Sequence, residues 1–446
     1  MLRRFFGSGG TSAAPLTMAL PIVMALHQRA WAFSGKTQPP NSLATLDHRV
    51  RQLEDSACID GLLAFYGRRL HAEFDMSVVV RRCTDPEYNT YIFSHKELPL
   101  FLAHHVRAID NLPVGLNAMD SVVELRRFMA ASFKRLVNCP LPLCEKTRAG
   151  FLEAVQEIND QRQDVDILRK MALGVLELKE HLSRHTRARL TSTQQLVKHD
   201  VIYQKILPEL RLLQGPLDEC NRYFIYYNFL ASQLMNLEGQ TKSRGRIGTI
   251  DTEINLLELV KGSVEEAKQL CTHVYSDCPD VKIIVPNNME PTTFAHKSST
   301  IHYILVELMK NALRATVDAH MTRNAAGLVN CDDMPPVRVL VTSPSSMSHA
   351  CVCIEDEGKG IPRSQMDLVM SYTYTTAAKP ALELMEAVNH HHSSSEEVDM
   401  SPLAGYGFGL PVSRMYARCF GGDLTLQSIE GFGTKAYLYV KQSSML

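Results

Sequence analysis

Glu307-Leu-Met-Lys310-Asn311-Ala-Leu-Arg314 is the first of four short segments that decide the fold of the second half of this chain. The others follow in a fixed order: Asp356-Glu-Gly358-Lys-Gly360, Gly405-Tyr-Gly407-Phe408-Gly409 and Gly431-Phe-Gly433-Thr434. A single glycine triplet is a weak signal, because many such triplets are ordinary turns. Four segments of complementary chemistry in one order predict an ATP site that none of them would predict alone.

The first segment combines an acid and an amide one helical turn apart. Glu307 can orient or deprotonate an attacking hydroxyl group, and the Asn311 amide oxygen suits an octahedral Mg²⁺ that bridges phosphates. Both residues fall on the polar side of a helix predicted over 300–320. Lys310 and Arg314 can neutralise phosphate charge, although simple surface cations are an equally good interpretation.

The other three segments supply the remaining parts of a nucleotide site. Asp356 follows a strand and can accept a hydrogen bond from the adenine amino group, while Gly358 and Gly360 let the backbone approach a flat ligand. The glycine loop 405–409 precedes a helix, so its N–H groups can face phosphate oxygens. It is not a Walker A loop, since no Gly-Lys-Ser/Thr follows. Thr434 is a candidate ligand, with a hairpin turn as the alternative.

Two kinds of hydrophobic pattern divide the chain. Residues 43–237 show apolar positions at spacings of three and four, interrupted by prolines, which predicts a helical bundle. The polar, glycine-containing stretch 238–252 is interpreted as a linker. Residues 253–443 alternate helices with short β-branched strands, which predicts an α+β domain with helices on one face of a mixed sheet. The prolines expected to separate helices are Pro99, Pro113, Pro140 and Pro216.

Length and composition narrow the class of protein. A chain of 446 residues is expected to form two or three domains. The net charge of -1 gives no electrostatic case for a nucleic-acid partner, and no segment is apolar for long enough to predict a membrane span. The basic, Ser- and Ala-rich N-terminus predicts a mitochondrial targeting segment over 1–35, with a secretory signal over Leu16–Leu26 as the alternative. The 11 cysteines are expected to be reduced and mostly buried.

The four segments together resemble the ATP-binding fold shared by histidine kinases, type II topoisomerases, one class of heat-shock chaperones and the MutL mismatch-repair proteins (the GHKL superfamily). Within it, the chain most resembles the mitochondrial protein kinases that act on pyruvate and branched-chain α-ketoacid dehydrogenase complexes. The closer match lies in Glu307–Thr316, Ser371–Ala377, Pro402–Ala417 and Ile429–Thr434, with a weaker one at Gly174–Lys179.

The resemblance implies a four-helix-type regulatory bundle followed by a Bergerat-type α/β sandwich with a flexible ATP lid over 372–404. It implies ATP and Mg²⁺ as cofactors and serine phosphorylation of a dehydrogenase E1 α subunit in the mitochondrial matrix. Docking to a lipoyl-bearing E2 core and homodimerisation are further family traits. By similarity, Glu307 is the base and Asn311 the metal ligand. The nucleotide contacts expected from the residues and the resemblance are Lys310, Asn311, Arg314, Asp356, Gly358, Gly360, Thr375, Thr376, Gly405, Gly407, Phe408, Gly409, Leu410 and Thr434.

One departure from the family concerns the helical half. Relatives usually carry an Asn-Arg-His-Asn-Asp stretch whose His lies close to the catalytic acid, whereas this chain reads Asn159-Asp-Gln-Arg162-Gln-Asp164 without a histidine. The residues around Thr373–Ala377 favour the pyruvate type of kinase, and the position of the last residue favours the branched-chain type. Both substrates therefore stay open, as does an alternative function as a GHKL ATPase or an ATP-binding scaffold with reduced catalysis.

Overall fold

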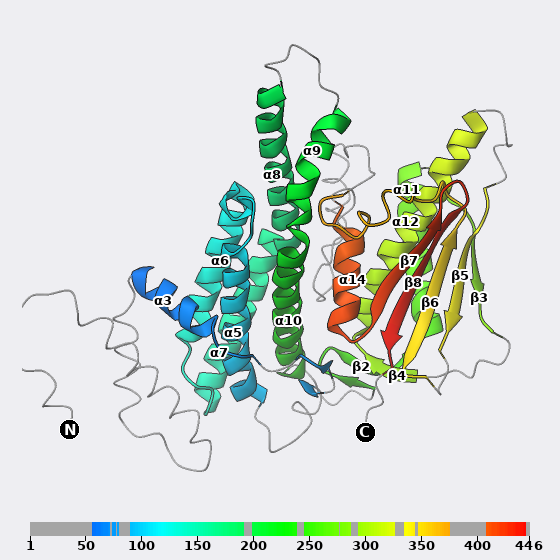
Figure 1. The fold of residues 1–446 in the computed structure, drawn as a ribbon. Coiled ribbons are helices and arrows are strands. Elements are labelled where there is room, and N and C mark those ends of the chain that lie inside the picture. The colour runs from blue at the N-terminus through cyan, green and yellow to red at the C-terminus, as the bar shows by residue number, and fades with distance from the viewer. Residues whose placement is uncertain are drawn as a thin grey trace, which may run out of the picture. The chain divides into compact units, whose positions relative to one another are not determined.

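The computed structural model describes residues 56–71, 74–76, 78–79, 90–190, 199–238, 245–275, 277–286, 293–325, 334–343, 347–374 and 407–442. The predicted targeting segment and residues 375–404 of the predicted lid lie outside these ranges. The first part of the described chain is helical and the second part combines helices with two sheets (Figure 1).

The helical part is built on amphipathic helices that pack side by side. α5 (Thr90–Asp110) packs on both α6 (Asp120–Val137) and α10 (Gln214–Glu238), and α6 also contacts α7 (Glu145–Val165) and α8 (Ile167–Leu190). The remaining helices are α3 (Ser56–Tyr66), the short 3-10 helix η2 (Leu116–Ala118) and α9 (His199–Arg211). Buried positions recur every three or four residues, as in the stripe Tyr223, Tyr227, Leu230 and Leu234 of α10. The predicted helical bundle is confirmed.

Two of the four prolines do not separate helices, which corrects the prediction. Pro99 lies in the interior of α5, and Pro216 lies in the first turn of α10. A proline in the first turn loses no helical hydrogen bond, because those N–H groups have no partner within the helix. Pro99 does cost a hydrogen bond, but the neighbouring residues Leu98 to Ala103 are almost completely buried. Packing of this segment therefore outweighs the local preference of proline for a break.

The main sheet has five strands in the order β3-β5-β6-β8-β7. β3 (Val281–Ile284) and β5 (Val337–Thr342) are parallel. The neighbours β6 (His349–Asp356), β8 (Gly433–Lys441) and β7 (Asp423–Ile429) join in antiparallel fashion. Helices α11 (Leu256–Tyr275), α12 (Ser298–Ala325) and α14 (Gly409–Cys419) lie on one face of the sheet (Figure 1). Helices on one face of a mixed sheet are what the sequence predicts for this part of the chain, and the α+β class is confirmed.

The predicted linker over 238–252 is wrong for its second half. β1 (Arg246–Ile247) and β2 (Ile250–Asn255) form a small sheet with β4 (Thr293–His296), in the order β1-β2-β4. The buried Gln233 of α10 holds this segment: its amide donates to the carbonyl of Ile247 at 3.0 Å and accepts from the N–H of Thr249 at 2.8 Å. Gly248 lies so close to Gln233 that a side chain would clash. A distant helix thus orders a stretch whose own composition is typical of a loop.

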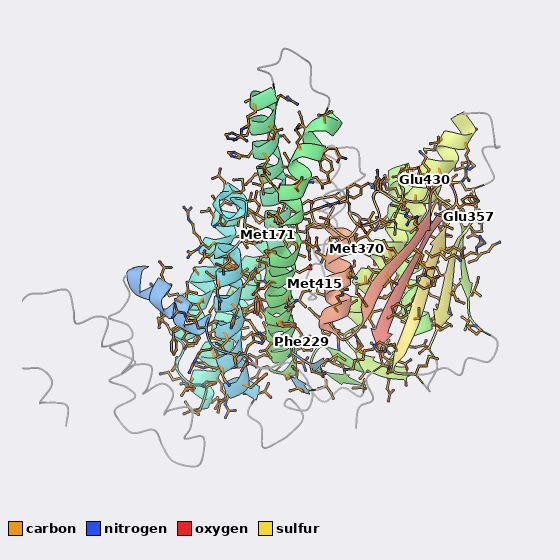
Figure 2. The ribbon with its side chains drawn as sticks, viewed as in Figure 1. Met171, Phe229, Glu357, Met370, Met415 and Glu430 are labelled. Atoms are coloured by element: carbon orange, nitrogen blue, oxygen red, sulfur yellow. The ribbon has the colours of Figure 1, made fainter. Side chains whose placement is uncertain are left out.

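Residues from the bundle also contact the α+β part of the chain directly. α14 packs against α10 as well as against α12 and the strand β7. Phe229 of α10 and Met415 of α14 are both buried at this contact (Figure 2), and the ring of Phe229 meets that of Phe420 edge-on at 5.3 Å. Residues 60–446 accordingly form one compact unit.

Candidate active site

One cavity of about 460 Å³ brings the predicted segments together. Its walls come from α12, from the end of β6 with the loop after it, from the first residues of α14, and from β7 and β8. The predicted base Glu307 lines it, together with nine of the predicted contacts: Lys310, Asn311, Arg314, Asp356, Gly360, Gly407, Gly409, Leu410 and Thr434. Thr375, Thr376 and Gly405 lie outside the described residues.

Glu307 occupies an enclosed position in this cavity. Only 4% of the residue is exposed, and Lys310 Nζ donates a hydrogen bond to its Oε1 at 2.6 Å. Its Oε2 lies against Gly409, the first residue of α14, where an added side chain would come within 2.6 Å of that oxygen. A buried carboxylate with one oxygen directed to a cation and the other to a glycine has a fixed orientation, which a catalytic base requires.

The next turns of α12 carry the polar residues that continue along the cavity. Asn311 is exposed and its carboxamide borders the cavity. Arg314 Nε lies 3.6 Å from Asp318 Oδ2, and both residues are cavity-lining. One face of α12 therefore places an acid, an amide and an ion pair in a row beside the cavity, formed by Glu307, Asn311, Arg314 and Asp318.

Asp356 lies at the last position of β6 and is 7% exposed. Its Oδ1 accepts backbone N–H groups from Gly358 at 2.9 Å and from Thr434 at 3.3 Å, which leaves Oδ2 for another donor. Burial raises the pKa of Asp356 to about 6, although the two backbone hydrogen bonds oppose the rise. This carboxyl group is held so that it can accept a hydrogen bond, and it stays ionised at neutral pH.

Glycines around Asp356 are required by close packing. An added side chain at Gly433 would meet the Asp356 carbonyl at 2.0 Å, and one at Gly360 would meet the Ile429 carbonyl at 2.0 Å. Gly358 does not line the cavity. It packs against Ala315 of α12, where a side chain would come within 2.8 Å. The absence of a side chain at Gly358 therefore allows the loop after β6 to approach α12.

The glycine loop presents its two faces to different surroundings. Gly407, Gly409 and Leu410 line the cavity, and Gly407 has a φ of 82°, which favours glycine. Phe408 faces away and is fully buried, with its ring 5.0 Å from that of Tyr372. The Tyr372 hydroxyl donates to Asp218 Oδ1 of α10 at 2.8 Å. Phe408 and Tyr372 therefore support the loop from behind, whereas the sequence suggested that Phe408 contacts the nucleotide.

Several cavity residues carry no motif and were missed. The loop after Gly360 supplies Ile361, Pro362, Gln365, Val369 and Tyr374, and Tyr374 donates its hydroxyl to Gln365 Oε1 at 2.6 Å. Strand residues Ile354, Leu426 and Ala436 form an apolar wall. The apolar wall could have been predicted from the alternation of side chains along a strand, because Ile354 lies two residues before Asp356 and so shares its face of β6. The loop has no comparable signal.

Comparison with known proteins assigns the chain to a family. Residues 65–251 match the family described as mitochondrial branched-chain alpha-ketoacid dehydrogenase kinase, and residues 296–444 match the family described as histidine kinase-, DNA gyrase B- and HSP90-like ATPase. A mitochondrial pyruvate dehydrogenase (acetyl-transferring) kinase of Drosophila melanogaster is 32% identical over 364 residues, which cover 80% of this chain and 78% of the relative. The chain belongs to the mitochondrial dehydrogenase kinase family.

Two further mitochondrial dehydrogenase kinases show how far the likeness extends. Pyruvate dehydrogenase kinase isozyme 3 of Homo sapiens is 31% identical over 366 residues, covering 80% of this chain and 79% of the relative. Isozyme 1 of Mus musculus is 29% identical over 446 residues, covering 98% of this chain and 88% of the relative. The likeness thus extends over both the helical bundle and the nucleotide domain.

The stretch in which this mitochondrial dehydrogenase kinase departs from its family lies at the end of α7. The guanidinium group of Arg162 lies over the rings of Phe224 and Tyr227, at 5.4 and 5.5 Å from their centroids. Burial raises the pKa of Tyr416 on α14, and the nearby charge of Arg162 opposes that rise. A permanent cation from the bundle therefore lies beside α14, in a stretch where the resemblance leads us to expect a histidine.

Proposed function

We propose that this chain is an ATP-dependent protein-serine kinase that phosphorylates the E1 α subunit of a mitochondrial 2-oxoacid dehydrogenase complex, pyruvate or branched-chain, and thereby inhibits it. The observation that carries the proposal is one cavity lined by the buried carboxylate Glu307 and by the hydrogen-bond acceptor Asp356. The relatives named as pyruvate dehydrogenase kinases support the reaction and the class of substrate.

Recognition of ATP begins with Asp356 in this proposal. The adenine amino group donates to its carboxylate, whose Oδ1 is already held by two backbone N–H groups. Ile354, Leu426 and Ala436 supply an apolar surface for the ring. Lys310, Arg314 and the N–H groups at the start of α14 face the phosphates.

Mg²⁺ fits the side chains that border the phosphate end. The Asn311 carboxamide is exposed beside the cavity, and the described residues contain no group of three His, Cys, Asp or Glu side chains able to hold an ion. An ion with one amide ligand would take phosphate oxygens and water as its other ligands, which is the usual coordination of Mg²⁺ with nucleotides. When bound, Mg²⁺ neutralises phosphate charge; Asn311 would hold it.

Glu307 acts on the acceptor serine. Its carboxylate takes the hydroxyl proton as the serine oxygen attacks the γ-phosphorus, and the bond to the β-phosphate oxygen breaks to release ADP. In this step Lys310 pairs with the phosphates instead of with Glu307, because a carboxylate that remains paired with a cation at 2.6 Å is a weak base. The enclosed position of Glu307 favours transfer to a docked hydroxyl group over transfer to water.

Replacing Asp356 with Asn is expected to change stability and ATP affinity in opposite directions. Because burial raises the folded-state pKa to about 6 from 3.8, ionised Asp356 disfavours the folded state at pH 7, by up to about 3 kcal/mol. This penalty disappears as pH falls from about 6 to about 4. Asp356→Asn should therefore raise the melting temperature at pH 7 but not at pH 4, and weaken ATP binding by about 1–3 kcal/mol. A lower melting temperature at pH 7 would contradict the burial argument.

The proposal includes a homodimer formed through the sheet face opposite the helices. Ile284, Leu340, Cys353 and Tyr437 form one row across β3, β5, β6 and β8. Ile284 and Leu340 are 44% and 39% exposed, and Tyr439 in the adjacent row is 37% exposed. An exposed apolar row of this kind suits a second copy of the same chain, because each copy would cover the row of the other.

Leu340→Glu is expected to weaken the dimer at least about tenfold, because it places a charge in the middle of the apolar row. Leu212→Glu is the matched control, since Leu212 is 60% exposed but lies in the helical bundle. Sedimentation velocity over a concentration series measures the dimer dissociation constant of both variants. Equal dissociation constants for the two variants would argue against this face.

The other partners and the location follow from the same function. We place the kinase in the mitochondrial matrix, docked on the lipoyl-bearing E2 core of its complex. The relatives are named mitochondrial, and the basic N-terminal segment supports import. None of the described helices has the length and apolar character needed to cross a membrane.

Loss of dehydrogenase activity tests the function. Purified pyruvate and branched-chain complexes are incubated with the kinase and Mg-ATP, and NADH production is followed. Inhibition of one complex that grows with time and requires ATP would support the proposal and name the substrate. Full activity of both complexes, with ATP hydrolysis or ATP binding alone, would favour the ATPase or scaffold function.

A further inference from the structure

Tyr303 lies one helical turn before Glu307 on α12 and is 6% exposed. Its hydroxyl is buried and has no hydrogen-bond partner among the residues that the structure describes. Buried hydroxyl groups are nearly always paired, because desolvation without a partner destabilises the folded state. A buried hydroxyl group without a partner, one turn from the proposed catalytic base, is therefore a candidate for a role in the reaction.

The surroundings of Tyr303 define what its hydroxyl can do. The ring packs against Tyr416 of α14, with centroids 5.5 Å apart and planes at 62°. Burial raises the pKa of Tyr303 well above its ordinary value, and the nearby charges of Glu307, Tyr416 and Asp166 raise it further, in that order. The phenol therefore stays protonated, and its anionic neighbours, the carboxylates of Glu307 and Asp166, can accept its proton in a hydrogen bond.

Glu307 is the neighbour best suited to receive this proton. Asp166 is the C-cap residue of α7 in the bundle, does not line the cavity, and accepts the backbone N–H of Arg169 at 3.1 Å through Oδ1. Lys310 is the partner of Glu307 in the structure, but it also borders the cavity and is directed to phosphate in the proposed reaction. When Lys310 turns to phosphate, Glu307 loses a hydrogen bond while remaining enclosed, and Tyr303 lies one turn away on the same helix face.

We propose that Tyr303 is a positioning residue, which donates its hydroxyl proton in a hydrogen bond to Glu307 when Lys310 pairs with phosphate, and so holds the carboxylate toward the acceptor serine. This inference rests on the proposed kinase function. A neutral donor is suited to the task, because it fixes orientation while reducing the basicity of the carboxylate less than a cation does. The orphan hydroxyl is then explained by the catalytic step.

The test removes one oxygen atom from each of two orphan tyrosines. Tyr303→Phe is compared with Tyr227→Phe, because the Tyr227 hydroxyl is also buried without a described partner but lies in the bundle on α10. Each full-length variant is assayed for phosphate transfer from labelled ATP to the dehydrogenase complex, for the Kd of Mg-ATP and for thermal unfolding. Neither variant loses a hydrogen bond seen in the structure, so the melting temperature should stay the same or rise.

We expect Tyr303→Phe to lower kcat about 10- to 100-fold, as displacement of a catalytic group by about 1 Å does. The KM for ATP and the Kd of Mg-ATP should stay within about twofold, and Tyr227→Phe should keep the unsubstituted kcat. A kcat within twofold of the unsubstituted chain, or an equal loss in both variants, would overturn the role of Tyr303 alone. If the unsubstituted chain labels neither complex, the kinase function fails and the role of Tyr303 fails with it.

Discussion

Glu307→Gln is expected to lower phosphate transfer about 10²- to 10⁴-fold, the range that general acid–base catalysis contributes. The amide keeps the size of the side chain and can still accept the hydrogen bond from Lys310, but it cannot take a proton from the acceptor serine. The Kd of Mg-ATP should stay within about threefold, because Glu307 acts on the attacking serine and not on the adenine or the phosphates of ATP.

Rapid-quench measurement of transfer, with calorimetric binding of Mg-ATP, separates these two effects. Glu430→Gln is the matched control: Glu430 is exposed in the turn between β7 and β8 (Figure 2) and does not line the cavity, so the same chemical change should have no effect. Transfer by Glu307→Gln within twofold of the unsubstituted rate would remove Glu307 from the reaction.

Asn311→Ala is expected to weaken the binding of Mg-ATP about 10- to 100-fold and that of metal-free ATP less than about threefold. The carboxamide is exposed beside the cavity, so its loss leaves no buried group unpaired and should not lower the melting temperature appreciably. Titration with ATP in the presence of Mg²⁺ and of a chelator gives both constants from one preparation. Equal losses in the two titrations would exclude Asn311 as the metal ligand.

The parts of the fold that could be predicted are those with strong local patterns. The five strands of the main sheet carry alternating or β-branched residues, and α12 carries apolar residues at helical spacing, such as Ile301, Ile304, Leu305 and Leu308. β1, β2 and β4 could not be predicted, because they are short, and the turn between β1 and β2 depends on Gln233 of a distant helix. The predicted helix break at Pro99 was wrong for a similar reason: burial of the neighbouring residues outweighs the preference of proline for ending a helix.

The candidate site shows the same division. Glycines and the polar face of α12 indicated where the nucleotide groups lie, since only glycine tolerates contacts such as that between Gly433 and the Asp356 carbonyl. Sequence spacing did not show that Phe408 faces Tyr372 and not the cavity, because neighbouring loop residues can point to opposite sides. It also gave no sign of Gln365 or Tyr374, which reach the cavity only through the path of the loop after Gly360.

The most direct test of the kinase assignment follows labelled γ-phosphate. The full chain is incubated with labelled ATP, Mg²⁺ and purified pyruvate and branched-chain dehydrogenase complexes, with Glu307→Gln in parallel, and the labelled residue is identified by mass spectrometry. We predict label on a serine of the E1 α subunit of one complex and none with Glu307→Gln. Bound or hydrolysed ATP without label on either complex would contradict the assignment.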